Sequence, residues 1–188
     1  ICMSSLKAGM DRKEHYEMRI GGSSLSEKMI ATWMLLNNKE NCVKVFNKTI
    51  TPDFESRMDH VDSGDLLVNG RKIEIKHSSR SFQYGHWPFD KFFICNKNSF
   101  DRAYPEPSFY FVINKEMTVA AVVNVSATRD RWTVEKVSDR DRPGGDNYLA
   151  YCLPLDDIIW QNIGNDALFP KYQITFSENM EIVSCGTV

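Results

Sequence analysis

The stretch that decides the fold is residues 63–77, Ser-Gly-Asp-Leu-Leu-Val-Asn-Gly-Arg-Lys-Ile-Glu-Ile-Lys-His. Asn69 and Gly70 stand between two apolar runs, and both residue types accept the positive φ angles of a type I′ turn. A two-residue turn fixes the pairing of its strands, so that Asp65 should lie opposite Glu74. The sequence therefore predicts a β-hairpin with a defined register.

Alternation along this hairpin separates an apolar face from a charged face. The apolar face consists of Leu66, Val68, Ile73 and Ile75. The other face carries Asp65, Leu67, Lys72, Glu74 and Lys76. Like charges at opposed positions repel by about a few tenths of a kcal/mol, so a positive charge should lie between the two carboxylates. A divalent cation or the ammonium of Lys76 would supply it, and an ordinary solvated strand face is the alternative.

The spacing of Asp65 and the run Glu74-Ile75-Lys76 resembles the active-site hairpin of the PD-(D/E)XK nuclease superfamily. The proline of the family motif is absent, because Gly64 precedes Asp65. The resemblance covers residues 21–79 by motif and the rest of the chain only by the order of elements. It implies a restriction-endonuclease-like fold, in which a mixed central sheet is flanked by helices.

The resemblance also implies a metal-dependent endonuclease that hydrolyses phosphodiester bonds in DNA. Glu27, Asp65 and Glu74 would bind Mg²⁺, or Mn²⁺ as a substitute, and Lys76 would orient the attacking water. Mg²⁺ is favoured because carboxylates are hard oxygen ligands, and a bound metal lowers the pKa of its water. The alternative is a catalytically inactive module of the same fold that binds nucleic acid or protein.

Glu27 has two interpretations. Gly21-Gly22 breaks the chain, and a helix is expected from Ser23 to Asn37. Ser24 and Glu27 would then form a capping box at its start. The resemblance instead implies a ligand of metal or water, and the sequence leaves both interpretations open. Two rival carboxylates precede the hairpin, namely Asp53 and Asp62.

The charge distribution bears on the partner. The net charge of −2 argues against a nucleic-acid enzyme, since phosphate binding relies on Lys and Arg. Basic residues nevertheless gather in residues 71–80, and we expect Lys72, His77 and Arg80 to contact DNA. A solvated basic strand end is the alternative. Residues 78–88 have a composition suited to phosphates and bases, or to an ordinary surface loop.

Composition limits the remaining classes. With 188 residues and 42% hydrophobic residues, the chain fits an N-terminal arm at 1–20 and one domain at 21–188. Five cysteines without a C-x-x-C spacing disfavour both a disulfide framework and structural zinc, so we expect an intracellular, cytoplasmic setting. The longest apolar stretches are far shorter than a membrane span. Cutting both strands of a duplex needs a second active site, which suggests a homodimer.

The rest of the chain predicts a mostly β protein. Strands are expected at 43–50, 92–95, 108–113, 118–123, 131–137, 148–153 and 172–176. Polar connections are expected at 51–62 and 138–147, and a short helix from Pro154 to Ile163. Together with the helix before the hairpin, these elements predict an α/β (α+β) domain with a mixed central sheet.

Overall fold

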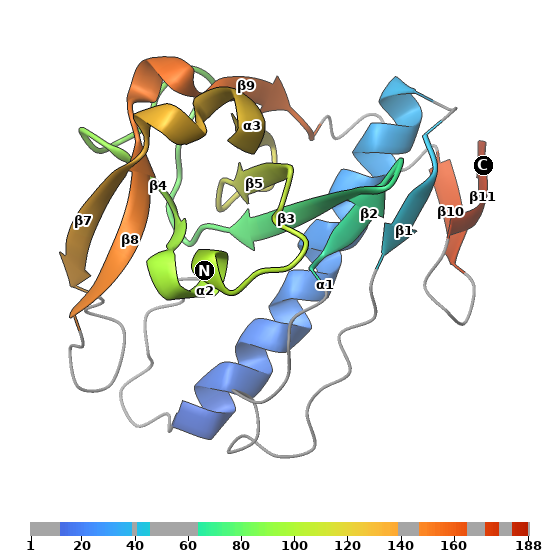
Figure 1. Ribbon diagram of the computed structural model, residues 1–188. Helices are drawn as coiled ribbons and strands as arrows, with labels where there is room; N and C mark the ends of the chain where they lie inside the picture. Colours follow the sequence, from blue (N-terminus) through green and yellow to red (C-terminus); the bar gives the residue numbers. More distant parts are fainter. Residues whose placement is uncertain are drawn as a thin grey trace.

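The computed structural model describes residues 12–38, 41–45, 64–138, 147–164, 172–176 and 182–187. Its centre is a six-stranded mixed sheet with the strand order β1-β2-β3-β5-β6-β9 (Figure 1). These strands are β1 (Val43–Val45), β2 (Leu66–Val68), β3 (Arg71–His77), β5 (Phe109–Ile113), β6 (Val119–Asn124) and β9 (Ile159–Asn162). The predicted fold class, a mixture of α and β elements around a mixed sheet, is confirmed.

The hairpin between β2 and β3 forms in the predicted register. Leu66 pairs with Ile73, and the turn residues Asn69 and Gly70 have φ angles of 49° and 78°. Positive φ at both positions is what a type I′ turn requires. The Asn69 side chain also accepts a 2.8 Å hydrogen bond from the backbone N–H of Cys42. This bond holds the start of β1 against the turn, and β1 pairs with β2 in antiparallel fashion.

The parallel pairing of β3 with β5 makes the sheet mixed. Glu74 lies opposite Tyr110, and Lys76 lies opposite Val112. Between these two strands the chain leaves the sheet to form β4 (Phe92–Asn96) and the short helix α2 (Lys97–Asp101). β4 belongs to a second sheet of order β4-β8-β7, with β7 at Thr133–Ser138 and β8 at Asn147–Leu153. A separate antiparallel pair is formed by β10 (Tyr172–Phe176) and β11 (Ile182–Thr187).

Two apolar clusters lie on opposite faces of the six-stranded sheet. Helix α1 (Arg12–Asn37) packs on one face, where Ile30 and Met34 meet the inward side chains Ile73 and Ile75. The other face, with Tyr110, packs against the β4-β8-β7 sheet. Among the described residues, α1 covers one face of this sheet and the β4-β8-β7 sheet packs on the other (Figure 1).

Helix α1 starts earlier than predicted. It runs unbroken from Arg12, so Gly21 and Gly22 lie inside it, and Ser24 is in mid-helix rather than at a cap. The capping-box interpretation of Glu27 is therefore wrong, since such a box exists only at a helix N-terminus. Each glycine costs about 1 kcal/mol relative to alanine. The preceding segment, rich in Arg, Lys, Glu and Met, has the helix propensity to continue through them.

The predicted helix at 154–163 is also wrong. A single 3₁₀ turn, η3 (Leu155–Asp157), is followed by strand β9, which pairs with the edge of β6. The run Ile158-Ile159-Trp160 is β-branched and aromatic, which favours a strand once an open sheet edge is available.

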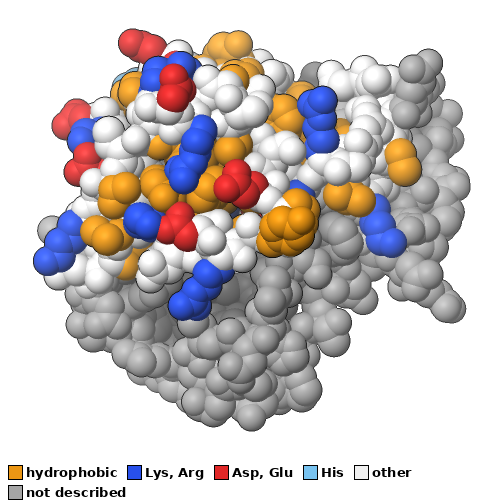
Figure 2. Space-filling view, viewed as in Figure 1, with side chains coloured by type: hydrophobic (Ala, Val, Ile, Leu, Met, Phe, Trp, Pro, Cys, Tyr) orange, Lys and Arg blue, Asp and Glu red, His pale blue; other side chains and the backbone are white. Residues whose placement is uncertain are grey.

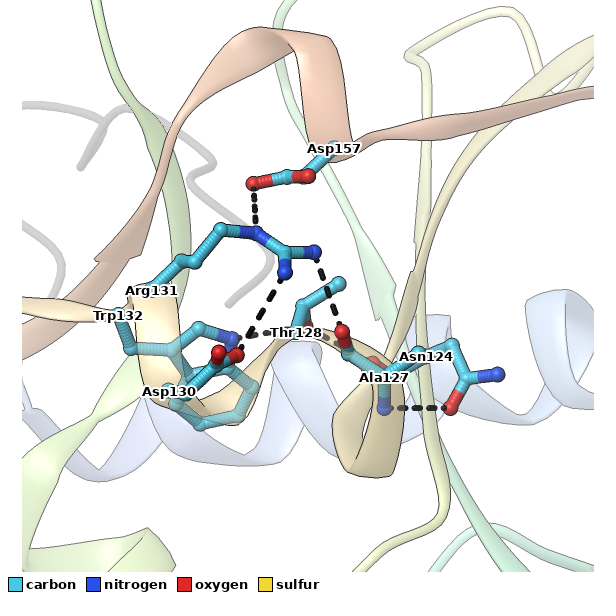
Figure 3. Close-up of polar contacts among 7 residues, drawn as sticks. All are labelled: Asn124, Ala127, Thr128, Asp130, Arg131, Trp132 and Asp157. Atoms are coloured by element: carbon cyan, nitrogen blue, oxygen red, sulfur yellow. Dashed lines mark hydrogen bonds and ion pairs between the residues drawn. The ribbon is translucent and has the colours of Figure 1, made fainter.

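Two short helices precede that segment and were not predicted. Helix α3 (Val125–Thr128) begins at Asn124, whose side chain accepts from the N–H of Ala127, and η2 (Arg129–Arg131) follows it. Arg131 then donates to Asp157 at 2.8 Å and to the carbonyl of Ala127 at 3.1 Å (Figure 3). These bonds tie α3 and η2 to η3, and so position the start of β9.

Several predictions lie outside the described residues. They are the arm before residue 12, the connection at 51–62 with Asp53 and Asp62, and most of the loop at 138–147. Among the helices that the structure describes, none has the length and apolar character needed to cross a membrane.

Candidate active site

Asp65 lies where the ladder between β2 and β3 ends. Its side chain is nearly fully buried, with 2% exposed, and its Oδ2 accepts a 2.5 Å hydrogen bond from the backbone N–H of Ile75. The backbone N–H of Asp65 donates to the carbonyl of Ile73 at 3.3 Å. The carboxylate thus takes the place that a strand carbonyl would hold. One residue both closes the hairpin and brings a buried carboxylate beside β3.

Gly64, which precedes Asp65, adopts a positive φ angle. Its φ angle is 94°, which proline cannot adopt because its ring fixes φ near −65°. A Cβ at this position would also lie 2.5 Å from Cε of Lys72. A glycine before Asp65 therefore allows the positive φ angle and leaves room for the Lys72 side chain.

Lys72 places a positive charge beside Glu74. Its Nζ lies 3.5 Å from Oε1 of Glu74, and the side chains are 4% and 19% exposed. A metal ion or Lys76 between Asp65 and Glu74 stays a prediction, and we expected Lys72 to contact DNA. A side chain that is buried beside Glu74 does not present its ammonium to a phosphate backbone. Lys72 therefore acts as an ion-pair partner of Glu74 within the candidate site.

Lys76 extends toward the second sheet. Its Nζ donates to the backbone carbonyl of Ile94 in β4 at 2.6 Å and lies 5.1 Å from the centre of the Tyr110 ring. The ammonium is thus fixed between the two sheets, on the face of β3 that also carries Glu74. The role of Lys76 in orienting a water stays a prediction.

Tyr110 shares the electrostatic environment of both carboxylates. Burial raises the pKa of its phenol well above the ordinary value, and Cys95, Glu74 and Asp65 raise it further. Burial likewise raises the pKa of the Cys95 thiol, against the opposing charge of Lys76. Tyr110 therefore stays protonated beside the site. Sequence reasoning missed Tyr110 and Cys95, because their proximity depends on strand pairings that no local pattern indicates.

Glu27 approaches from the other face of the sheet. It is buried, with 3% exposed, and it shares a stripe of α1 with Ile30 and Ala31 at helical spacing. That stripe packs on the face of Ile73 and Ile75, whereas Glu74 and Lys76 point away from it. A buried glutamate is uncommon, because charged side chains are almost never fully buried unless they are paired.

His77 and Arg80 follow the site along the chain. Nε2 of His77 lies 3.2 Å from the carbonyl of Lys115, and Arg80 is exposed with its guanidinium 5.0 Å from the centre of the Phe89 ring. Figure 2 shows basic and acidic side chains interspersed on the described part of one face, rather than gathered by sign. A nucleic acid on that face would therefore contact side chains of both charges.

The donor chemistry suits a hard cation. Asp65 and Glu74 offer carboxylate oxygens from neighbouring strands, and Oδ1 of Asp65 and Oε1 of Glu27 are buried atoms. In the described part of the chain, no three residues of the types His, Cys, Asp and Glu form a group that could hold a metal ion. Mg²⁺ commonly keeps several waters and takes one or two carboxylates. Asp65 and Glu74 would supply that number of carboxylates, and Mg²⁺ binding, with Glu27 as a third ligand, stays a prediction.

Comparison with known proteins adds no relative: no family model, no curated protein and no solved structure matches this chain.

Proposed function

We propose that this protein is a metal-dependent nuclease that cleaves phosphodiester bonds in DNA, with a restriction-endonuclease-like core. The observation that supports the proposal is the buried carboxylate of Asp65 at the end of the β2–β3 ladder, with Glu74 and Lys76 on one face of the adjacent strand. A structural role alone does not require this combination of two acids and a fixed lysine.

Each side chain has a role in this proposal. Asp65 and Glu74 would hold Mg²⁺ or Mn²⁺, which supplies Lewis acidity toward a phosphoryl oxygen and a bound water. Lys76, held by the Ile94 carbonyl, would orient the attacking water and stabilise developing negative charge. Lys72 keeps Glu74 in position. Glu27 is a predicted third ligand, although α1 brings it to the face of the sheet opposite to Glu74. Arg80 and His77 would contact the DNA.

A second candidate is an inactive module that binds nucleic acid or protein. The partners of the same carboxylates favour it, since Asp65 accepts from the Ile75 N–H and Glu74 lies beside Lys72. Both residues therefore also have roles in the fold. For the nuclease, cutting of both strands would need two sites, so we propose a homodimer in an intracellular setting.

The deciding experiment incubates the protein with supercoiled, linear, branched and single-stranded DNA, with Mg²⁺ or Mn²⁺ and then with chelator. The nuclease proposal predicts cleavage that stops without metal. It also predicts that Lys76→Ala loses cleavage while calorimetry still detects metal binding. An absence of cleavage on every substrate would favour the inactive module, and a Lys76→Ala protein that cuts normally would remove the lysine from the mechanism.

A further inference from the structure

The loop that joins β3 to β4 presents two aromatic rings to solvent. Tyr84 is 58% exposed and Phe89 is 45% exposed. They are the ends of a row of rings whose middle is packed into the molecule. The row runs in order of contact through Tyr84, Trp160, Phe82, Trp87 and Phe89, with 5.0 to 6.4 Å between the centroids of neighbouring rings. The exposed rings thus contact the partly buried Trp160 and Trp87, which pack on the buried Phe82.

Hydrogen bonds hold this loop in one conformation. The indole N–H of Trp87 donates to the carbonyl of Lys91 at 3.0 Å, and the Asn114 side chain donates to the carbonyl of Phe82 at 3.0 Å. Gln83 and His86 form a β-bridge across the turn that carries Tyr84. Rings that are already fixed lose little conformational freedom when a ligand packs on them. The loop is therefore preorganised for contact.

Both ends of the loop are anchored beside Lys76. The loop begins directly after β3, which carries Lys76, and it leads into β4, whose Ile94 carbonyl accepts the lysine. Arg80 lies near the start of the loop with its guanidinium 5.0 Å from the centre of the Phe89 ring. A ligand on the rings would thus lie on a segment that is connected to the proposed active site on both sides.

An exposed ring beside an arginine suits a nucleotide. Every base has a π-face that stacks on an aromatic side chain, and a guanidinium binds phosphate through its planar set of N–H donors. The loop also carries the exposed acid Asp90, and Glu116 accepts from Ser81 at its edge. Stacking, rather than net charge, must therefore supply most of the affinity.

We infer that Tyr84 and Phe89 stack the bases of an unpaired nucleic-acid strand while Arg80 binds its phosphate. Base faces inside a duplex are already stacked on one another, so these rings can reach bases only in a single strand, a flap or a bubble. The inference rests on the proposed nuclease function for its consequence, namely that the cleaved substrate contains unpaired nucleotides. Binding itself needs no hydrolysis.

The test measures binding in chelator, where no cleavage occurs. A labelled single strand of about 16 nucleotides and the duplex of the same sequence are titrated by fluorescence anisotropy. A second strand contains 2-aminopurine, whose fluorescence falls when the base stacks. We expect the single strand to bind at least about ten-fold more tightly than the duplex. Tyr84→Ala and Phe89→Ala should each weaken single-strand binding by about ten-fold, and Phe89→Trp should retain it.

Tyr104→Ala is the matched control, because Tyr104 is an exposed ring outside the loop, and it should leave both affinities unchanged. Circular dichroism of each variant checks the fold. Equal affinity for the two forms of DNA would overturn the inference, as would normal 2-aminopurine quenching by Tyr84→Ala and Phe89→Ala. One outcome is a protein that prefers single-stranded DNA and loses affinity in Tyr84→Ala and Phe89→Ala, yet cleaves nothing with any metal. That result would support the stacking surface and contradict the nuclease proposal.

Discussion

At the scale of single residues, each carboxylate of the candidate site makes a contact that also stabilises the fold. Asp65 replaces a strand carbonyl for the Ile75 N–H, and Glu74 lies beside the buried Lys72 ammonium. The sequence alone predicts mutual repulsion, so that removing either charge should be neutral or stabilising. The lysine reverses this expectation for Glu74, because loss of the carboxylate charge leaves a cation in the interior.

Glu74→Gln should therefore lower the free energy of unfolding by about 1–3 kcal/mol, since it removes an anionic partner of Lys72. Adding Lys72→Met should recover most of that loss, because the buried charge is removed as well. Urea denaturation of the single and double variants measures both effects. A Glu74→Gln protein as stable as the parent would show that repulsion between the carboxylates outweighs the ion pair.

Gly64→Ala should destabilise the protein more than Gly70→Ala. Both glycines have positive φ angles, which cost an L-residue about 1–2 kcal/mol. A Cβ at Gly64 would additionally meet the Lys72 side chain, whereas no atom lies within 4 Å of a Cβ at Gly70. The difference in thermal stability between the two variants measures the cost of the contact with the Lys72 side chain. Equal losses would mean that Lys72 moves aside without cost.

At the level of elements, the local sequence predicts the hairpin correctly, but it does not predict how the neighbouring strands and helices pair and pack. The Asn69-Gly70 turn and the alternation around it predict β2 and β3 with their register, since both are set within a few residues. The pairing of Glu74 with Tyr110 joins β3 to β5 across the excursion through β4 and α2. No neighbouring residues encode that pairing, so the protonated phenol beside the site could not be predicted.

Competition between local and tertiary preferences explains the two wrong helix predictions. Gly21-Gly22 is a break by propensity, but α1 continues through it and gains packing against β1 and β3 farther along. Residues after Pro154 carry acids typical of a helix start, yet the chain forms β9 on the open edge of β6. Asn96 and Asn124 cap α2 and α3, but these helices have only five and four residues and are too short to show a helical pattern in the sequence.

The unbroken α1 yields a direct test. Gly21→Ala and Gly22→Ala should each raise the free energy of unfolding by up to about 1 kcal/mol, because alanine is the better residue in a helix interior. A helix that began at Ser23 would instead need the glycines for a turn, and both substitutions would then destabilise. Denaturant titration, combined with the helical signal in circular dichroism, distinguishes the two. A drop in both quantities would contradict the continuous helix.

At the scale of the whole molecule, the candidate site lies between layers. Glu74 and Lys76 face the β4-β8-β7 sheet, while Glu27 comes from α1 on the opposite side of the six-stranded sheet. The indole N–H of Trp33 donates to the Asn162 carbonyl at 3.0 Å and so links α1 to β9 at the sheet edge. The position of Glu27 relative to the hairpin thus depends on packing between layers.

Buried cysteines make the free energy of unfolding depend on pH in the alkaline range. Burial raises the pKa of Cys152 from 9.0 to about 11, with a smaller contribution from Glu135. Between these values the thiol ionises in the unfolded chain but stays protonated in the folded one. The free energy of unfolding should therefore be unaffected by this group below pH 9 and fall as the pH rises from 9 toward 11. Cys95 acts in the same direction.

Thermal unfolding across this range in reducing buffer measures the effect. Cys152→Ala should flatten the decline, while Cys42→Ala, at an exposed position, should leave it as steep as in the parent. A Cys152→Ala protein with an unchanged slope would assign the alkaline loss to other groups.

The hydrogen bond from the Ile75 amide to Asp65 Oδ2 also provides a spectroscopic reporter. A short bond from an amide to a carboxylate shifts the amide proton downfield and slows its exchange with solvent. Any ion that draws electron density from the Asp65 carboxylate should move that resonance, whereas a ligand that binds elsewhere should leave it in place. One backbone proton in a nitrogen-15 correlation spectrum would therefore report occupancy of the site without any substrate, and it would do so even in a protein that cleaves nothing.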